Sequence, residues 1–274
     1  MLSLSQKLSL NTIKNLGGGG FSNKYSCLFD GVDEAVIINE DAALKPTTAI
    51  SISLWMKPTE WDISGASTNQ VALGCVSSGG WMIKLQKAAG ATQLLFMISV
   101  TDDTTNCKGG VNYIGSILGS TQTEALSGWV HVVATYTGGA CTLYYNASTT
   151  GVTNTPGCPT ATINYHASAS RPVFIGADAA TDTTGSDFFP GHIDEVAIYD
   201  SVLSASNVTD IYNSGTPTDL ADASAPGNSD LIGYWRMGDP DGTSTYPTIS
   251  DHSTNSNDGT MDNMESGDIV TDVP

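Results

Sequence analysis

The sequence predicts an all-β protein, a sandwich of two antiparallel sheets with one short helix. Short runs rich in apolar and β-branched residues recur along the chain, and turns rich in glycine and asparagine separate them. The 274 residues include 29 glycines, and only 14% are charged, a composition that suits turn-rich β structure better than helices. One short stretch, between Ser204 and Gly215, has apolar residues at helical spacing. These three observations together favour a β-sandwich.

The expected strands follow one another at short intervals. In chain order they are Tyr25–Phe29, Ala35–Ile38, Ser51–Lys57, Gln70–Cys75, Trp81–Gln86, Gln93–Val100, Trp129–Tyr136, Cys141–Asn146 and Arg171–Gly176. Pro58 ends the third of them, because proline cannot donate a hydrogen bond to a neighbouring strand. Gly79, Gly80, Gly138 and Gly139 mark turns between neighbours, which favours antiparallel pairing.

A further strand at 191–200 differs from the others. Its residues Val196–Tyr199 are consecutive apolar side chains, which predicts burial on both faces. Asp194 and Glu195 interrupt this apolar run, and carboxylates inside a strand need a partner. This strand is therefore expected to hold both core and polar contacts.

The predicted helix follows directly. Ser204 is suited to cap its N-terminus, and Val208, Ile211 and Tyr212 give it an apolar stripe at helical spacing. Gly215 is expected to end it, since glycine adopts the left-handed conformation found after many helices.

Three motifs occur in a fixed order. FDGVDE covers Phe29–Glu34, GWVHVVA covers Gly128–Ala134 and is followed by Tyr136, and GHIDEVAIY covers Gly191–Tyr199. Together they resemble the opening, middle and closing strands of laminin-G-like, concanavalin-A-like jelly-roll domains. The resemblance implies the jelly-roll fold, but it does not fix the function, because lectins, glycosidases, adhesion modules and virion proteins share this fold.

The chain is expected to have three parts. Residues 1–20 form an N-terminal arm with a glycine hinge, 21–215 the laminin-G-like sandwich, and 216–274 a linker and tail. The tail resembles a segment that often accompanies such domains, and it is too short to fold alone, so it should pack on the sandwich or on a partner. The leucines of Met1–Leu16 predict that the arm packs against another chain or a particle surface.

The net charge of −18 argues against nucleic-acid binding, because phosphates would be repelled. It fits either a soluble surface or a cation-binding one. The sequence has no run of about 20 apolar residues, so no membrane span is predicted. The N-terminal residues do not resemble a secretion signal.

The five cysteines are an odd number, so at least one is unpaired. Cys27 and Cys75 are expected in the core, whereas a disulfide among Cys107, Cys141 and Cys158 is left open.

A fold usually found outside cells, without a secretion signal and with an unpaired thiol, is typical of a virion protein made in the host cytoplasm. The resemblance extends to laminin-G-like structural proteins of marine tailed phages. It implies a non-enzymatic, oligomeric component that decorates a capsid or forms part of a fibre, contacts other capsid or tail proteins through the arm and the tail, and meets host glycans. The alternative is an extracellular carbohydrate-binding or adhesion lectin that is not part of a virion.

Catalysis is not expected. Glycosidases of this fold need two carboxylates on one strand face, because acid and nucleophile flank one bond. In a regular strand Asp194 and Asp200 would share a face about 20 Å apart. The sequence therefore predicts no catalytic residues.

The resemblance implies a structural calcium ion beside the pairing of the first and closing strands. Its ligands would be Asp30, the Gly31 carbonyl and Asp194, with Asp33 a weaker candidate. The alternative is that Asp30 and Asp194 only accept hydrogen bonds from nearby amides.

Glycan binding would use an exposed aromatic ring to stack on a sugar. Trp61, Trp81, Tyr113 and Tyr165 lie in or beside predicted loops and are the candidates. The alternative for each is burial in the core, where Trp55, Trp129 and Trp235 are expected to lie for the most part.

Overall fold

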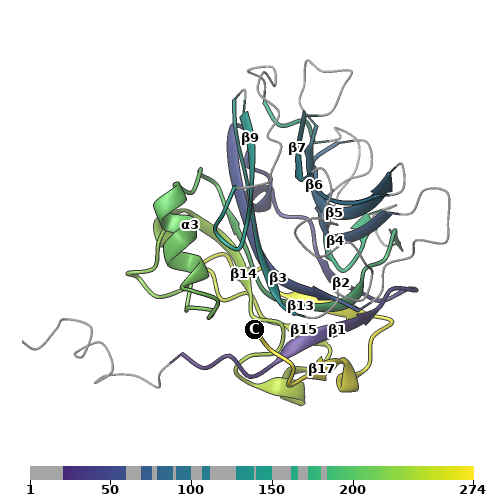
Figure 1. The fold of residues 1–274 in the computed structure, drawn as a ribbon. Coiled ribbons are helices and arrows are strands. Elements are labelled where there is room, and N and C mark those ends of the chain that lie inside the picture. The colour runs from purple at the N-terminus through teal and green to yellow at the C-terminus, as the bar shows by residue number, and fades with distance from the viewer. Residues whose placement is uncertain are drawn as a thin grey trace, which may run out of the picture.

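The computed structural model is a two-sheet antiparallel β-sandwich, as the sequence predicts (Figure 1). It describes residues 21–59, 69–75, 79–88, 91–99, 107–111, 128–138, 140–149, 162–165, 172–179 and 184–274. The predicted arm Met1–Leu16 lies outside these residues. Within them, no helix is long and apolar enough to cross a membrane.

The first sheet, sheet A, contains both the opening and the closing strand. Its strands in spatial order are β17 (Ile269–Val270), β1 (Ser26–Asp30), β13 (Pro190–Tyr199), β3 (Ala49–Pro58), β8 (Val130–Thr137) and β9 (Ala140–Tyr145), and β14 (Leu231–Trp235) also pairs with β13. β13 is central, and all ten of its residues are buried. The prediction of burial on both faces is thus confirmed for Val196–Tyr199, and it extends to the whole strand.

The second sheet, sheet B, faces the inner side of sheet A. Its strands in order are β15 (Thr248–Ile249), β16 (Gly259–Asp262), β2 (Ala35–Ile38), β10 (Val173–Ile175), β4 (Asn69–Cys75), β5 (Trp81–Ala88), β6 (Ala91–Ile98) and β7 (Cys107–Val111). A small hairpin of β11 (Asp178–Ala179) and β12 (Gly185–Ser186) lies beside it. Alternate residues such as Ile52 and Leu54 of β3 meet Ile83 and Phe96 of sheet B in one continuous core. Cys27, Cys75 and Cys141 are buried in this core.

The outer side of sheet A is covered by the helix and by part of the tail. Helix α3 (Ala205–Tyr212) lies on the side away from β4–β7 (Figure 1). Its Val208 and Ile211 pack with Val133, Tyr199 and Tyr234 in a second apolar cluster. Sheet A is therefore covered on both faces over part of its surface, which explains the unbroken apolar run in β13.

The start of α3 is as predicted, but its end differs. The Ser204 hydroxyl accepts a hydrogen bond from the Asn207 amide, 3.2 Å away. The helix ends at Tyr212, and its left-handed C-cap is Asn213; Gly215 also has a positive φ, of 94°, but it lies two residues beyond the cap. Asparagine tolerates this conformation better than most residues with a β-carbon, so it stops the helix two residues early.

Residues 216–274 add strands to both sheets. β14 pairs with β13, β17 pairs with β1, and β16 pairs with β2 and β15. The short η helices of this region cover Asn228–Asp230, Gly242–Thr245 and Ser266–Asp268, and another lies earlier at Ala42–Leu44. The segment with linker-like composition also packs on the body, since Leu220 is only 3% exposed. The tail is therefore built into the sandwich.

Candidate functional site

The turn after β1 holds three of the predicted calcium ligands. The Asp30 carboxylate accepts hydrogen bonds from the amides of Val32, at 2.7 Å, and Asp33, at 3.4 Å. The Asp30 amide in turn donates to Glu34. Gly31 has a φ of 75°, and a β-carbon there would lie 2.7 Å from Pro190, so glycine is needed at this position. These hydrogen bonds are the ones expected under the alternative prediction, in which Asp30 accepts bonds from turn amides and binds no calcium.

Asp194 lies elsewhere. Asp30 pairs with Pro190 across the β1–β13 ladder, so Asp194 is four residues further along β13, about 13 Å away. Its carboxylate accepts hydrogen bonds from Asn23 Nδ2 (2.9 Å) and from the Glu195 amide (2.8 Å). The structure therefore does not bring the four predicted ligands together. In the described part of the chain, no three His, Cys, Asp or Glu side chains are grouped as metal ligands. Calcium binding stays a prediction.

A β-bulge explains the two adjacent carboxylates of β13. The register shifts between Asp194 and Ala197, and Glu195 has a φ of 49°. A regular strand would point the two side chains to opposite faces, but the bulge lets Glu195 face the tail. There it accepts hydrogen bonds from the Tyr234 hydroxyl and, at 3.2 Å, from Arg236 Nε.

Asp194, Glu195, Arg236 and Asp239 form a buried ionic cluster. Asp239 accepts hydrogen bonds from the amides of Lys24 and Tyr25, at 2.7 and 3.3 Å, and it lies 3.6 Å from Arg236 Nη2. Burial raises the pKa of Glu195 to about 7, although Arg236 opposes the shift. Burial and the neighbouring Glu195 raise the pKa of Asp194. Because all these side chains are buried and hydrogen-bonded to the protein, the cluster fastens residues 21–25 and the tail to the sandwich.

The predicted glycan-binding aromatics are not exposed together. Trp81 is fully buried in the core, so it offers no ring face to a sugar. Tyr165 is partly exposed and packs against the core, and its hydroxyl donates to the Pro46 carbonyl at 3.0 Å. Trp61 and Tyr113 lie outside the described residues. The structure thus favours the core alternative for Trp81.

A different aromatic site lies on the outer side of sheet A. His192 of β13 pairs with Lys57 of β3, and Trp129 immediately precedes Val130, which pairs with Met56. The three side chains therefore stand side by side, on β13, on β3 and just before β8, and the rings of Trp129 and His192 are 5.8 Å apart. We call Lys57, Trp129 and His192 the carboxylate cradle, because the carboxylate of Asp272 lies between them. Lys57 and Trp129 are partly exposed, whereas His192 is only 8% exposed and forms the inner wall of the cradle.

Each oxygen of the Asp272 carboxylate has its own donor. Trp129 Nε1 donates to Oδ1 at 3.0 Å, and Lys57 Nζ donates to Oδ2 at 2.6 Å. His192 Nε2 is 3.8 Å from Oδ2. Burial tends to raise the pKa of Asp272, but the bonds from Lys57 and Trp129 outweigh it and lower the pKa. Burial lowers the pKa of His192, which leaves Lys57 as the fixed positive charge of the cradle.

The sequence analysis missed this site. Trp129, assigned mostly to the core, belongs to neither apolar cluster and is partly exposed. The alternation in Ser51–Pro58 was a usable signal, since Trp55 and Lys57 fall on the face opposite Leu54 and Met56. Nothing in the sequence around Asp272 indicates that it reaches Lys57, because 215 residues separate the two.

The next row of side chains on the same face of sheet A, which includes Trp55 and His131, is covered by α3. His131 Nε2 lies 2.8 Å from the Ser53 hydroxyl, and Tyr212 of α3 stacks on Trp55 and His131. Burial lowers the pKa of His131 to about 3, so the ring is neutral at physiological pH. This row is part of the structural support beneath α3.

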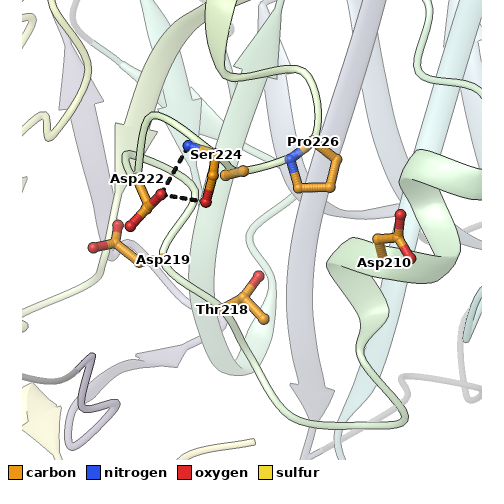
Figure 2. A pocket seen from close by; sticks show the side chains of 7 residues that line it. Asp210, Thr218, Asp219, Asp222, Ser224 and Pro226 are labelled. Carbon is orange, nitrogen blue, oxygen red and sulfur yellow. Dashed lines mark hydrogen bonds between the residues drawn. The ribbon is translucent and has the colours of Figure 1, made fainter. Parts of the chain in front are cut away.

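A separate cavity of about 250 Å³ lies beside α3 (Figure 2). It is lined by Asp210, Thr218, Asp219, Asp222, Ser224, Ala225 and Pro226. The Asp222 carboxylate accepts hydrogen bonds from both the amide and the hydroxyl of Ser224. Asp219 accepts one from the Ala221 amide. These bonds shape the loop, so the carboxylates act as turn formers.

Comparison with protein families identifies the fold. Residues 30–209 match the model of the concanavalin A-like lectin/glucanases superfamily, of the laminin G type. The chain belongs to this family. No curated protein sequence matches it.

One solved structure shows the same fold, and two others resemble it less closely. A Bacteroides ovatus protein, provisionally assigned as carbohydrate-binding, superposes with a TM-score of 0.59 at 15% identity, covering 89% of this chain and 60% of that one. The heptameric SAP-like pentraxin of Limulus polyphemus gives 0.48 at 14% identity, covering 69% and 82%. Domains LG4-5 of the mouse laminin alpha1 chain give 0.43 at 16%, covering 64% and 41%. The chain thus spans less than two thirds of the Bacteroides protein.

Proposed function

We propose that this protein is a non-enzymatic, lectin-like binding domain that binds glycans at the carboxylate cradle. One observation carries the proposal: a partly exposed indole stands beside a lysine and an imidazole on a rigid sheet. An indole face suits the apolar face of a sugar ring, and the polar neighbours suit its substituents. The Bacteroides structure has the same fold, which is consistent with such a role.

The placement of Asp194 and Glu195 supports binding over catalysis. A glycosidase needs two carboxylates beside a substrate cleft, about 5–9.5 Å apart. Here both are almost fully buried, at 0% and 2% exposed, and both accept hydrogen bonds from the protein itself. Their place in the structure suits a role in stability.

A panel of immobilised glycans would test the proposal. The full chain should bind at least one glycan class, and Trp129→Ala should abolish that binding while the protein stays folded by circular dichroism. Tyr246→Ala is a matched control, because Tyr246 is an exposed aromatic residue of the tail. Absence of binding to every glycan, or binding that survives Trp129→Ala, would refute the cradle as the lectin site.

We further propose that the domain works as a component of a virus particle, joined to other particle proteins through residues 1–20. The anchoring of residues 21–25 supports this. Arg236 donates to the Ser22 carbonyl at 2.9 Å and lies 4.4 Å from the Phe21 ring centre, and Asn23 bonds to Asp194. A force applied to residues 1–20 would be transmitted through these contacts to the sandwich. Deleting residues 1–16 should leave folding intact and prevent incorporation into particles, as seen by electron microscopy. Normal incorporation would contradict the proposal.

A further inference from the structure

We propose that the cradle selects glycans that contain a uronic acid, and that Asp272 occupies the site as an exchangeable internal substitute. This inference rests on the proposed function, because it names the ligand class of that same site. It is carried by the contacts of Asp272, whose side chain already shows which chemical group the cradle accepts.

The donors of the cradle match the two oxygens of one carboxylate. The two oxygens of Asp272 meet two different donors, an ammonium group and an indole N–H. Charge-assisted hydrogen bonds of this kind are the stronger ones in proteins. A neutral hydroxymethyl group at the same place could accept one of these bonds but could not balance the charge of Lys57. The geometry therefore discriminates a uronic acid from its neutral sugar.

The Asp272 side chain is able to leave without unfolding the tail. It is 41% exposed, and Lys57 is 24% exposed, so the pair is a surface contact of small net strength. The backbone nearby is held separately, since the Asp272 carbonyl accepts a 2.6 Å hydrogen bond from the buried Ser26 hydroxyl. Rotation of one side chain would open the cradle while β17 stays paired with β1.

A carboxylated sugar fits the cradle better than an acidic peptide. The indole of Trp129 is partly exposed beside the carboxylate position, and it is tilted by 58° from the His192 ring. A pyranose ring attached to the carboxylate can lie against this surface, as sugars do on aromatic side chains. An extended peptide would also need free backbone hydrogen-bonding groups. β3, which holds Lys57, is already paired on both sides, with β13 and β8.

The net charge of −18 disfavours anions at long range. This repulsion is screened beyond about 8 Å at physiological salt. The experiment is therefore done at about 0.15 M salt, where the local contacts of the cradle decide the affinity.

Occupancy of the cradle by Asp272, which we call self-occupancy, also weakens binding. A glycan binds only those molecules in which Asp272 has left the site, so the apparent affinity falls in proportion to the occupied fraction.

The test compares oligosaccharides of galacturonate, glucuronate and mannuronate with their methyl esters, in which a methyl group neutralises the charge of the carboxyl group. Binding to the full chain is measured by calorimetry. At least one acid should bind about tenfold more tightly than its ester, as expected for a charge-assisted bond. Asp272→Asn should tighten acid binding about threefold by removing the competitor. Lys57→Gln should remove the preference for the acid, so that acid and ester bind equally.

Matched controls and a direct signal complete the design. Asp241→Asn and Lys24→Gln make the same charge changes at exposed positions and should alter nothing. The indole N–H resonance of Trp129, assigned by its loss in Trp129→Phe, should shift both in Asp272→Asn and when the acid is added.

Three outcomes would overturn the inference in different ways. Equal binding of acid and ester, both lost in Trp129→Ala, would leave the lectin proposal standing and refute the selection of carboxylates. Tighter acid binding that is unchanged by Asp272→Asn would refute self-occupancy. Binding of a peptide with the sequence of residues 268–274, without binding of any glycan, would refute the lectin proposal and identify a protein-binding site.

Discussion

Asp239 and Asp272 are two carboxylates of the same tail, and the protein holds them in opposite ways. The Asp239 side chain is fully buried and accepts bonds from two backbone amides beside Arg236. The Asp272 side chain is 41% exposed and accepts bonds from two side chains. Backbone amides in a folded chain cannot turn away, whereas a lysine side chain can. Burial and the kind of donor therefore separate a permanent fastening from an exchangeable contact.

Arg236 should show the largest effect, because it lies between the two buried acids Glu195 and Asp239. Arg236→Met should lower the free energy of unfolding by about 3–5 kcal/mol, since it leaves buried charge uncompensated. Chemical denaturation measures this value. Lys24→Met removes a positive charge from an exposed neighbour and should cost less than 1 kcal/mol. Equal costs would show that general charge, and not the buried pair, decides the loss.

The same substitution at the two tail carboxylates tests the comparison directly. Asp239→Asn should cost about 1–3 kcal/mol, because the part-buried amide bonds from Lys24 and Tyr25 lose a charged acceptor. Thermal unfolding and hydrogen exchange at these two amides would measure it. If exchange there were unchanged, Asp239 would not be the group that holds residues 21–25.

The buried cluster should also make stability depend on pH. The folded-state pKa of Glu195, about 7, is above its ordinary value of 4.5, so the folded protein keeps a proton that the unfolded chain releases. Its contribution to stability is therefore present at low pH and is lost as the pH rises from about 4.5 to 7. Relative to Glu195→Gln, the wild type should lose up to about 1.4 kcal/mol per pH unit in this window. Parallel curves for the two proteins would contradict the raised pKa.

Asp272→Asn should give the smallest change in stability. The exposed ion pair with Lys57 contributes no more than about 1 kcal/mol, so the melting temperature should move by a few degrees at most. A loss as large as that of Asp239→Asn would show that Asp272 is part of the structural fastening, and the exchangeable role would be wrong.

Most of the fold was predictable from residues near one another in the sequence. Strand positions followed from short alternating runs, and the helix start followed from Ser204. The site was less predictable. A bulge at Glu195 turned both acids of β13 to internal partners, which regular strand spacing could not indicate. Trp81 is buried in the core, one of the two positions that the sequence left open for it.

The sequence by itself determined the sandwich, the family and the burial of β13, because these depend on the spacing of apolar side chains and on local motifs. The tertiary structure decided which carboxylates meet which donors. Asp272 reaches Lys57 across 215 residues, and Asn23 reaches Asp194 across 171. Such pairs are set by the register of β17 on β1 and of β13 on β3. Many sequences with the same apolar pattern could form these sheets, but one set of registers puts a tail carboxylate between a lysine and an indole.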